Sequence, residues 1–351
     1  MAWLTTTIGA YPKPDYVPTP DWFRDGGAGL SNPTEAYQKY LTDLPSDIEE
    51  ILDRGTQEVV NDQVNVGIDI PTDGEIRREN YIHYHCRHID GIDFSNLTSK
   101  VSRQGAWMAN LPTVTDPLKT RDHFLPRDYR IAQAATDRPI KITVPGPMTI
   151  TDTIADVYYK DDKRLGAALS AALNEEILAL ANAGCTWIQV DEPVFARKPD
   201  KALDYGIENL ERCFHGLPDH VARAVHICCG YPDYLDQENY QKADRMAYLK
   251  LSDAIEDSSI QAISLEDAHR HNDLSLLEHF KTTTVILGVI AIANSRIETV
   301  AEITERLQAA LQHIDADRLI AAPDCGLGFL DRKLAFAKLA NMVSVAKSVS
   351  D

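Results

Sequence analysis

The sequence predicts an α/β fold, specifically a (β/α)8 TIM barrel. Eight short β-rich runs alternate with longer helical patterns along the 351 residues, and such alternation indicates a parallel sheet with crossover helices. A closed barrel is the simplest such fold at this length. The rival is a doubly wound open sheet. It usually carries a glycine-rich phosphate loop after its first strand, and Thr5-Thr-Thr-Ile-Gly-Ala-Tyr has no such motif.

The expected strands, in chain order, are residues 4–8, 67–71, 140–144, 187–190, 224–228, 261–265, 284–289 and 319–322. Between the second and third strands, residues 96–126 are hard to assign, and we expect an excursion from the barrel there. Residues 11–33 are rich in proline and glycine and are expected to be irregular surface. We expect residues 1–351 to form a single catalytic barrel domain.

Four of the helices between these strands have clear signals. Ser46 with Glu49 forms a capping-box pattern that opens a helix toward residue 64. Asp162 is expected to cap a helix that ends near Gly184. Apolar residues spaced three or four apart predict an amphipathic helix over residues 297–314. Asp331 is expected to cap the last helix.

Composition excludes several classes of protein. The net charge of -18, from 53 acidic and 35 basic residues, argues against a nucleic-acid binder. The most apolar run, residues 285–293, is shorter than the ~20 residues of a membrane span. The first residues lack the basic and apolar parts of a signal peptide, so we expect a cytoplasmic protein. Its six cysteines should then be reduced, and cysteine with histidine suggests metal or nucleophile chemistry.

Polar and thiol residues follow the expected strands at the end where barrel enzymes carry their active sites. His226 and Cys228 are two apart on a strand, so their side chains point to the same side. Glu266 and Cys325 follow the sixth and eighth strands, which lie close to the fifth around the barrel top. Thiolate, imidazole and carboxylate together suit tetrahedral zinc. The sequence therefore predicts a zinc site.

Other cysteines and histidines have plainer interpretations. Cys229 should face the helix layer as a small buried residue, and Cys185 and Cys213 look structural for the same reason. The cluster from His83 to His88 has a spacing that could hold a metal, although most such clusters are not metal sites, and its position after Glu75 makes substrate contact the other option. The pair His269 and His271 is expected to be loop surface.

Three carboxylates at strand ends have two interpretations. Asp191 and Glu192 could end a strand or cap a helix, and Glu75 could do the same with nearby arginines as ion-pair partners. Acids at neighbouring strand ends could instead hold the ammonium group of an amino-acid substrate. The residues alone leave both interpretations open.

Taken together, these residues resemble the cobalamin-independent methionine synthase family, specifically its catalytic C-terminal barrel. The matching stretches lie in family order and cover almost the whole chain: Thr5-Thr-Thr-Ile-Gly, Asp73-Gly-Glu, Gly146-Pro-Met-Thr-Ile, Ile188-Gln-Val-Asp-Glu-Pro, His226-Ile-Cys, Ile263-Ser-Leu-Glu and Pro323-Asp-Cys-Gly-Leu. The combination is highly specific, although each piece alone is weak.

The resemblance implies a role for each of these positions. Zinc would be held by His226, Cys228, Glu266 and Cys325. The homocysteine backbone would be held by the residues Ile8, Gly9, Glu75 and Asp191. Glu192 adjoins Asp191, and we add it as a candidate substrate contact. Glu266 and Asp191 are the candidate catalytic residues, and no cofactor-binding residue is identified.

Departures from the family pattern concern the methyl donor. The full-length family has two barrel halves, of which the missing one helps to bind folate, and this chain is about the size of one. The family's serine after Ile-Gly is Ala10 here, a tryptophan that stacks on the pterin aligns with Thr153, and a proton-donating histidine aligns with Ala293. The thiol and zinc side is therefore intact, whereas the donor side is altered.

We therefore expect zinc-dependent transfer of a methyl group to the thiol of homocysteine, which gives methionine. Glu266, the hardest ligand, is expected to yield its place to the incoming sulfur. The partners would be a small-molecule thiol and a methyl donor, either 5-methyltetrahydrofolate-type or a methylcorrinoid protein, with no nucleic acid and no membrane. A homo-oligomer is one option for the assembly.

Three rivals stay open. The first uses another thiol acceptor, such as coenzyme M, or another methylated donor, since single-barrel relatives include alkyltransferases that act on coenzyme M. The second is a zinc- or thiol-binding barrel without catalysis. The third is the decarboxylase branch of the same superfamily, which would not need these thiolates.

Overall fold

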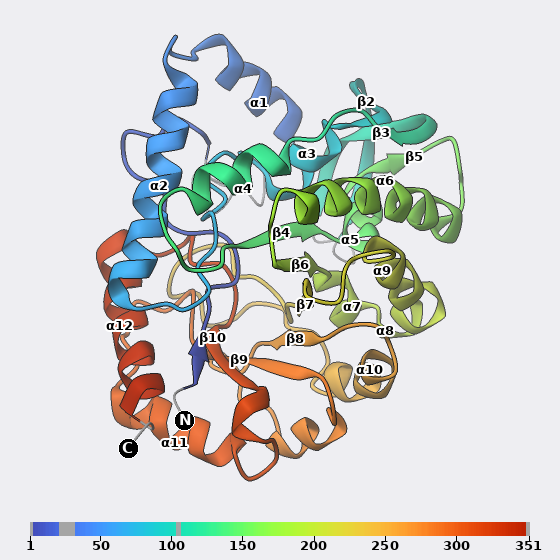
Figure 1. Cartoon of the computed structure of the whole chain (residues 1–351). Coiled ribbons are helices and arrows are strands. Elements are labelled where there is room, and N and C mark those ends of the chain that lie inside the picture. The colour runs from blue at the N-terminus through green and yellow to red at the C-terminus, as the bar shows by residue number, and fades with distance from the viewer. Residues whose placement is uncertain (1–2, 21–31, 103–106, 349–351) are drawn as a thin grey trace.

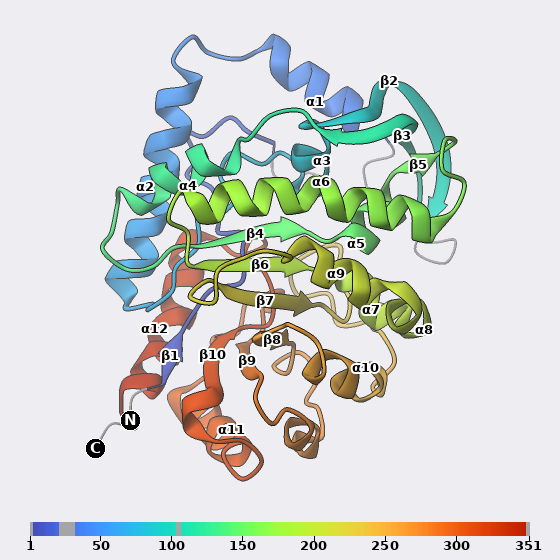
Figure 2. The same ribbon diagram turned by 45° about the vertical axis from the view of Figure 1, so that its right-hand side comes forward.

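Seven parallel strands form the main sheet, in the order β1-β10-β9-β8-β7-β6-β4. The structure is a computed structural model and describes residues 3–20, 32–102 and 107–348. The strands are β1 (Leu4–Thr5), β4 (Lys141–Pro145), β6 (Trp187–Asp191), β7 (Ala222–Ile227), β8 (Ala262–Leu265), β9 (Thr284–Ile290) and β10 (Leu319–Pro323). Figures 1 and 2 show the helices arranged around this sheet.

The remaining barrel position is filled by residues 70–72. Parallel bridges join Thr6 to Ile70 and Thr72 to Lys141, and the Lys141 N–H donates to the Pro71 carbonyl at 2.8 Å. This segment connects β1 to β4 and closes the ring, so the predicted TIM-barrel fold is confirmed. The second strand is shorter and begins later than expected. Gly67, at φ 107°, ends the preceding helix instead of starting the strand, and proline has no N–H for a ladder.

The crossover helices differ in length, and several are a single turn at the rim. The longer ones are α2 (Ile48–Val66), α4 (Leu125–Gln133), α6 (Asp162–Asn182), α10 (Ala247–Glu256), α11 (Val300–Ala310) and α12 (Arg332–Ser348). The shorter ones are α3 (Tyr81–Cys86), α5 (Pro147–Thr153), α7 (Pro193–Arg197), α8 (Pro199–Lys201) and α9 (Ile207–Cys213). A further helix, α1 (Pro33–Thr42), precedes the barrel helices.

Two predicted helix starts are wrong by one residue each. The capping box of Ser46 and Glu49 does not form, because α2 begins at Ile48 after Asp47 and the Glu49 carboxylate accepts from Arg77 at 2.7 Å. In α6 the cap is Asp161, whose carboxylate accepts the N–H groups of the second and third helical residues. Only the residue before the first turn reaches those groups.

The other helix ends follow the predicted signals more closely. Gly184 adopts φ 106° just after α6, as a glycine at this place should. Helix α11 is shorter than predicted, because Thr299 and Glu302 form a reciprocal capping box that starts it at Val300. Asp331 caps α12 as predicted, since its carboxylate accepts the N–H of Leu334 at 2.8 Å.

The expected excursion between the second and third barrel strands is a long antiparallel hairpin. It consists of β2 (Ile89–Ser102) and β3 (Trp107–Thr120), with the short β5 (Ala155–Asp156) added parallel to β3 in a separate sheet. In Figure 2 this sheet lies on the side toward which β4, β6 and β7 point. Of the segment predicted to be irregular, residues 11–20 contain no helix or strand and residues 21–31 lie outside the described part.

Two apolar clusters make the core. The larger lies between the sheet and the helices, and a small one fills the barrel interior. The interior cluster consists of Ile8, Ala224, Ala262, Ile286, Ile320 and Ala322. Alanines on three of these strands leave space inside the ring for polar side chains above and below them.

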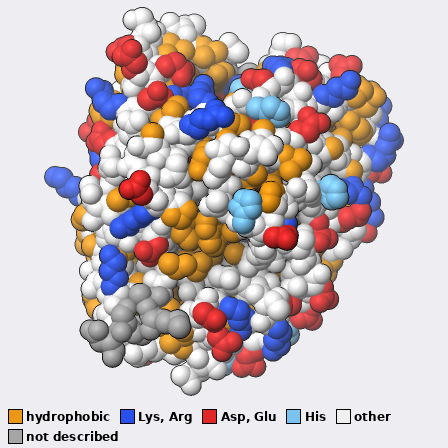
Figure 3. Space-filling view, viewed as in Figure 1, with side chains coloured by type: hydrophobic (Ala, Val, Ile, Leu, Met, Phe, Trp, Pro, Cys, Tyr) orange, Lys and Arg blue, Asp and Glu red, His pale blue; other side chains and the backbone are white. Residues whose placement is uncertain are grey.

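The surface carries charged side chains of both signs. Acidic and basic side chains are interspersed on the face shown in Figure 3, without a continuous basic area. Within the described residues, no helix has both the length and the apolar character needed to cross a membrane.

Candidate active site and metal centre

A chamber of about 910 Å³ opens at the carboxyl ends of the barrel strands. It is lined by seven residues singled out from the sequence, namely Ile8, Gly9, Glu75, Asp191, His226, Cys228 and Cys325. They come from β1, β6, β7 and β10 or the loops that follow the strands. Parallel strands place their carboxyl ends on one rim, which explains why residues so far apart in sequence meet.

The imidazole of His226 and the thiols of Cys228 and Cys325 form a compact cluster at the base of the chamber. Their candidate ligand atoms all lie within 4.8 Å of one another. His226 Nε2 is 3.3 Å from Cys325 Sγ, and its Nδ1 is 2.9 Å from Ser264 Oγ. The Ser264 contact occupies one ring nitrogen and orients the other toward the thiols, as second-shell partners of metal-bound histidines do.

Burial keeps the His226 ring neutral. It lowers the pKa of His226 to about 3, and the positive charge of Lys141 acts in the same direction. Neutral imidazole is the form that binds a metal ion. The ring is therefore in its ligand form throughout the neutral pH range.

Glu266 lies beside this cluster rather than within it. The carboxylate is buried and hydrogen-bonds with Cys228, and burial followed by the Cys228 charge raises the pKa of Glu266 well above its ordinary value. Lys242 opposes this shift from 3.9 Å. The described residues that meet the distance requirement for a shared metal are the histidine and two cysteines. A fourth ligand from Glu266 stays a prediction.

Glu75 and Asp191 form a second group of the chamber, with no basic side chain hydrogen-bonded to Asp191 in the described structure. Glu75 accepts from Thr143 Oγ1 at 2.7 Å and from Arg78 at 3.3 Å, and Asp191 accepts from Gln189 Nε2 at 2.7 Å. Burial and then the charge of Glu75 raise the pKa of Asp191 to about 8. A cation between the two acids would offset both effects, so the pair is suited to an ammonium group.

A tight turn presents Glu75 to the chamber. Glu75 adopts φ 58° and the preceding Gly74 φ 67°, and the Glu75 N–H donates to Asp73 Oδ1 at 3.1 Å. A left-handed backbone is uncommon for a residue with a side chain and is often found at functional sites. Gly9 permits the approach, because a Cβ there would lie 2.6 Å from Glu75 Oε1.

Glu192 is fully buried and is not one of the residues that line the chamber, and its role as a substrate contact stays a prediction. Its carboxylate accepts the N–H groups of Met148 and Thr149 at 2.9 and 3.0 Å and the Thr149 hydroxyl at 2.7 Å. It thus binds the free N–H groups at the start of α5. Gly146 makes room for it, since a Cβ there would lie 2.2 Å from the carboxylate.

The remaining cysteines belong to the outer core, as expected. Cys185, Cys213 and Cys229 are all buried in the cluster between sheet and helices. Cys229 adjoins a candidate ligand just after β7 yet packs in the outer core.

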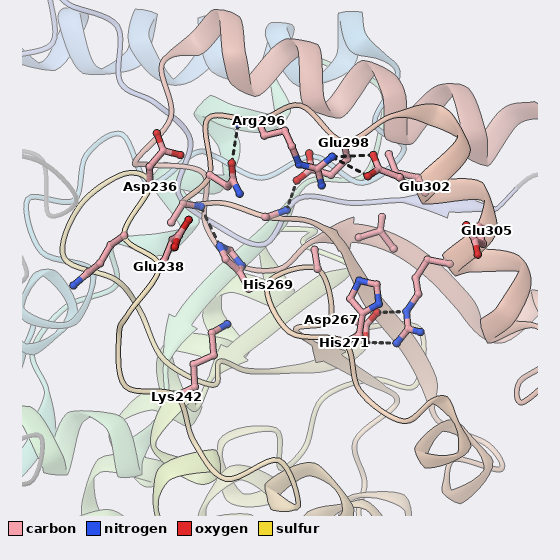
Figure 4. A pocket seen from close by; sticks show the side chains of 18 of the residues that line it. Asp236, Glu238, Lys242, Asp267, His269, His271, Arg296, Glu298, Glu302 and Glu305 are labelled. Carbon is pink, nitrogen blue, oxygen red and sulfur yellow. Dashed lines mark hydrogen bonds and ion pairs between the residues drawn. The ribbon is translucent and has the colours of Figure 1, made fainter.

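His269 corrects the expectation of loop surface, whereas His271 is exposed. His269 Nδ1 lies 2.7 Å from Asp324, and its Nε2 accepts the N–H of Ala293 at 3.2 Å. Both of its nitrogens are therefore engaged. Ala293 itself lines a neighbouring cavity of about 750 Å³, drawn in Figure 4.

The His83–His88 cluster lies on and just after α3, and none of its histidines belongs to a potential metal group of the described residues. Burial lowers the pKa of His83 to about 3 and that of His85 well below its ordinary value. His85 Nδ1 contacts the Tyr81 carbonyl at 2.8 Å, and His88 pairs with Asp122 at 2.9 Å. These contacts favour a structural role.

Replacing His83 with glutamine should reduce the sensitivity of the protein to acid. The folded pKa of about 3 lies below the unfolded value of ~6.5. The unfolded chain therefore binds the proton first, and the contribution of His83 to stability is lost as pH falls below 6.5. Between pH 7 and pH 5 the free energy of unfolding, measured in urea, should fall by about 2 kcal/mol less in the variant than in wild type. His271→Gln, at an exposed site, is the control, and equal losses in all three proteins would refute the burial effect.

Several residues of the site were not predicted from the sequence. Ser264 lies two positions before Glu266, and Thr143 and Gln189 also lie on barrel strands, so strand alternation was the available signal for all three. Lys242 lies in a loop without regular structure, and nothing in the local sequence indicates that it approaches Glu266.

Comparison with known proteins agrees with this geometry. The profile of the family described as "Cobalamin-independent synthase, Catalytic domain" matches residues 3–348. Proteins named methionine synthase from Sulfolobus acidocaldarius and Thermococcus kodakarensis are each 29% identical to this chain. The alignments cover 97% of it and 90% and 91% of those proteins.

A solved structure is similar over the whole fold. It is a B12-independent methionine synthase from Shewanella sp. W3-18-1 in complex with selenomethionine, 30% identical, with a TM-score of 0.85. It covers 99% of this chain, and this chain covers 98% of it. The matches therefore span at least nine-tenths of the length of each of these relatives. The chain therefore belongs to the catalytic-domain family of cobalamin-independent methionine synthases and is an enzyme of the methyltransferase type.

Proposed function

We propose that this protein is a zinc-dependent methyltransferase that transfers a methyl group to the thiol of homocysteine and so forms methionine. One observation carries the proposal. The His226, Cys228 and Cys325 cluster and the Glu75 and Asp191 pair line the same chamber. Homocysteine needs both, because its sulfur must be activated while its charged backbone is held in place.

The donor set fits zinc. A neutral imidazole and two thiols lie within 4.8 Å of one another, and a buried carboxyl hydrogen-bonds with one thiol. Zinc takes N, S and O ligands in a tetrahedral arrangement, with His226, Cys228, Cys325 and Glu266 as the proposed holders. When bound, zinc keeps a coordinated thiol deprotonated at neutral pH and so supplies the nucleophile.

The protein's own residues supply orientation. We propose that Glu75 and Asp191 bind the ammonium group, with the backbone at Ile8 and Gly9 alongside. The Shewanella relative was solved with selenomethionine, an analogue of the proposed product. Fixing the sulfur relative to the donor methyl would contribute much of the rate enhancement through positioning.

The chamber extends from the thiol cluster to Thr153, Arg197 and Lys198 at the rim, where the donor would enter. Thr153 itself offers no aromatic surface for stacking, whereas Tyr81, Tyr231 and Tyr240 also line the chamber. The proposed donor is a 5-methyltetrahydrofolate-type molecule or a methylcorrinoid protein. Coenzyme M is a weaker candidate for the acceptor. It carries a sulfonate and no ammonium, and the Glu75 and Asp191 carboxylates would repel that anion.

The proposal is tested by product mass. Zinc-loaded protein is incubated with homocysteine or coenzyme M, each against methyltetrahydrofolates, methylcobalamin and other methyl compounds. Methionine from at least one donor is the expected result. Methylated coenzyme M without methionine would overturn the assignment of the acceptor. Zinc binding without turnover of any donor would favour a zinc- or thiol-binding barrel without catalysis. We further propose a cytoplasmic location and a single catalytic domain over residues 1–351.

A further inference from the structure

Lys242 lies in the loop between β7 and α10 and lines both the chamber and the neighbouring cavity. Figure 4 shows its side chain extending from the loop, with the amino group directed toward His269. The Lys242 side chain is only 14% exposed. It therefore places a positive charge between two cavities, close to the candidate ligands.

The amino group of Lys242 is incompletely satisfied. Its Nζ is buried and has no hydrogen-bond partner among the described residues. The Glu266 carboxylate is 3.9 Å away, and the centre of the Tyr240 ring is 4.9 Å away. A buried ammonium without a hydrogen bond is unfavourable, so a second arrangement that supplies one would be favoured.

The buried Glu266 carboxylate in turn needs a charge partner when it is not a metal ligand. Its side chain is only 6% exposed, and the ammonium group of Lys242 is the cation that lies within ion-pair distance of it among the described residues. If Glu266 leaves the ligand set, it becomes a buried charge, and a buried charge without a partner costs several kcal/mol. Asp324 does not compete for Lys242, because it already accepts from the His269 ring and from the N–H groups of residues 267–269.

We propose that Lys242 is the positioning residue that receives the Glu266 carboxylate when the acceptor thiol takes its ligand position. The inference rests on the proposed function. A shift of about 1 Å closes the 3.9 Å separation to the length of a charge-assisted hydrogen bond. The two side chains would thereby exchange an unsatisfied ion pair for a hydrogen-bonded one, and homocysteine binding would become more favourable.

The test uses cobalt-substituted protein, in which thiolate-to-metal absorption reports sulfur ligation without any turnover. Wild type, Lys242→Met, Lys242→Arg and the control Lys163→Met are loaded with cobalt, checked for metal content and titrated with homocysteine. Lys163 pairs with Asp204 on the exposed surface, so its variant removes an ion pair elsewhere. Lys242→Met should bind one metal as wild type does, with its midpoint raised at least tenfold. Arginine should largely restore the midpoint, and Lys163→Met should match wild type.

A double variant shows whether Lys242 acts through Glu266. In a Glu266→Gln background the displaced group is neutral, so adding Lys242→Met should shift the midpoint less than twofold. Equal midpoints for wild type and Lys242→Met would overturn the role of Lys242 and leave the proposed function standing. A full tenfold shift caused by Lys242→Met in the Glu266→Gln background would likewise overturn the role of Lys242 and leave the proposed function standing. No spectral response of the wild type to homocysteine would overturn both.

Discussion

Replacing Cys325 with serine is expected to release the metal and abolish methyl transfer. Cys325 Sγ lies 3.3 Å from His226 Nε2 and hydrogen-bonds with Cys228, so it is central to the three-residue cluster. A serine hydroxyl is hard and remains protonated at neutral pH, which makes it a poor zinc ligand. Loss of even an outer-shell partner reduces metal affinity about 10- to 100-fold, and loss of this thiolate should exceed that.

Metal content after desalting, measured by mass spectrometry, checks this prediction together with the rate of methionine formation. Cys229→Ser is the matched control, because Cys229 directly follows the candidate ligand Cys228 but belongs to the outer core. It should keep one zinc per chain and its activity. A Cys325→Ser protein that retained both zinc and activity would show that the cluster is not the metal site.

Replacing Asp191 with asparagine is expected to weaken homocysteine binding about 10- to 100-fold while the zinc content stays unchanged. A hydrogen bond to a charged group contributes ~1.5–3 kcal/mol, and each 1.4 kcal/mol corresponds to a factor of ten. Asp191 lines the chamber beside Glu75, and burial and the Glu75 charge raise its pKa to about 8 although Lys141 and Arg78 oppose the shift. An ammonium group bound beside the two acids would add a positive charge and favour the ionised carboxylate.

A substrate analogue isolates this interaction. 4-Mercaptobutyrate is homocysteine without its amino group, so wild type should prefer homocysteine by a similar factor and Asp191→Asn should lose most of that preference. Competition binding to the zinc-loaded proteins measures both ratios. Asp204→Asn, at an exposed residue, should behave as wild type. An undiminished preference in Asp191→Asn would show that the ammonium group is bound elsewhere.

Much of the fold and of the site followed from two regularities. The alternation of strands and helices predicted the barrel. The residues after the strands predicted which side chains gather at the rim. These regularities bring together His226, Cys228 and Cys325. Their capacity to bind a metal follows from residue type alone. The resemblance to a family then supplied Glu75 and Asp191 as a substrate pair.

The rest depended on tertiary contacts that no local pattern encodes. Glu192 follows Asp191 directly, yet its carboxylate turns to the start of α5 because Gly146 leaves room there. The second barrel position consists only of bridges, since Gly67 ends a helix and Pro71 lacks a donor. Lys242 approaches Glu266 across a loop whose path depends on the packing of the whole rim.

X-ray absorption at the zinc edge, before and after addition of homocysteine, tests whether the acceptor thiol binds to a metal held by His226 and the two cysteines. Two sulfur atoms at about 2.3 Å from zinc are expected in the free protein and three after homocysteine is added. Using selenohomocysteine instead should place one selenium next to zinc. An unchanged count of two sulfurs, with no selenium neighbour, would contradict binding of the acceptor thiol to this metal.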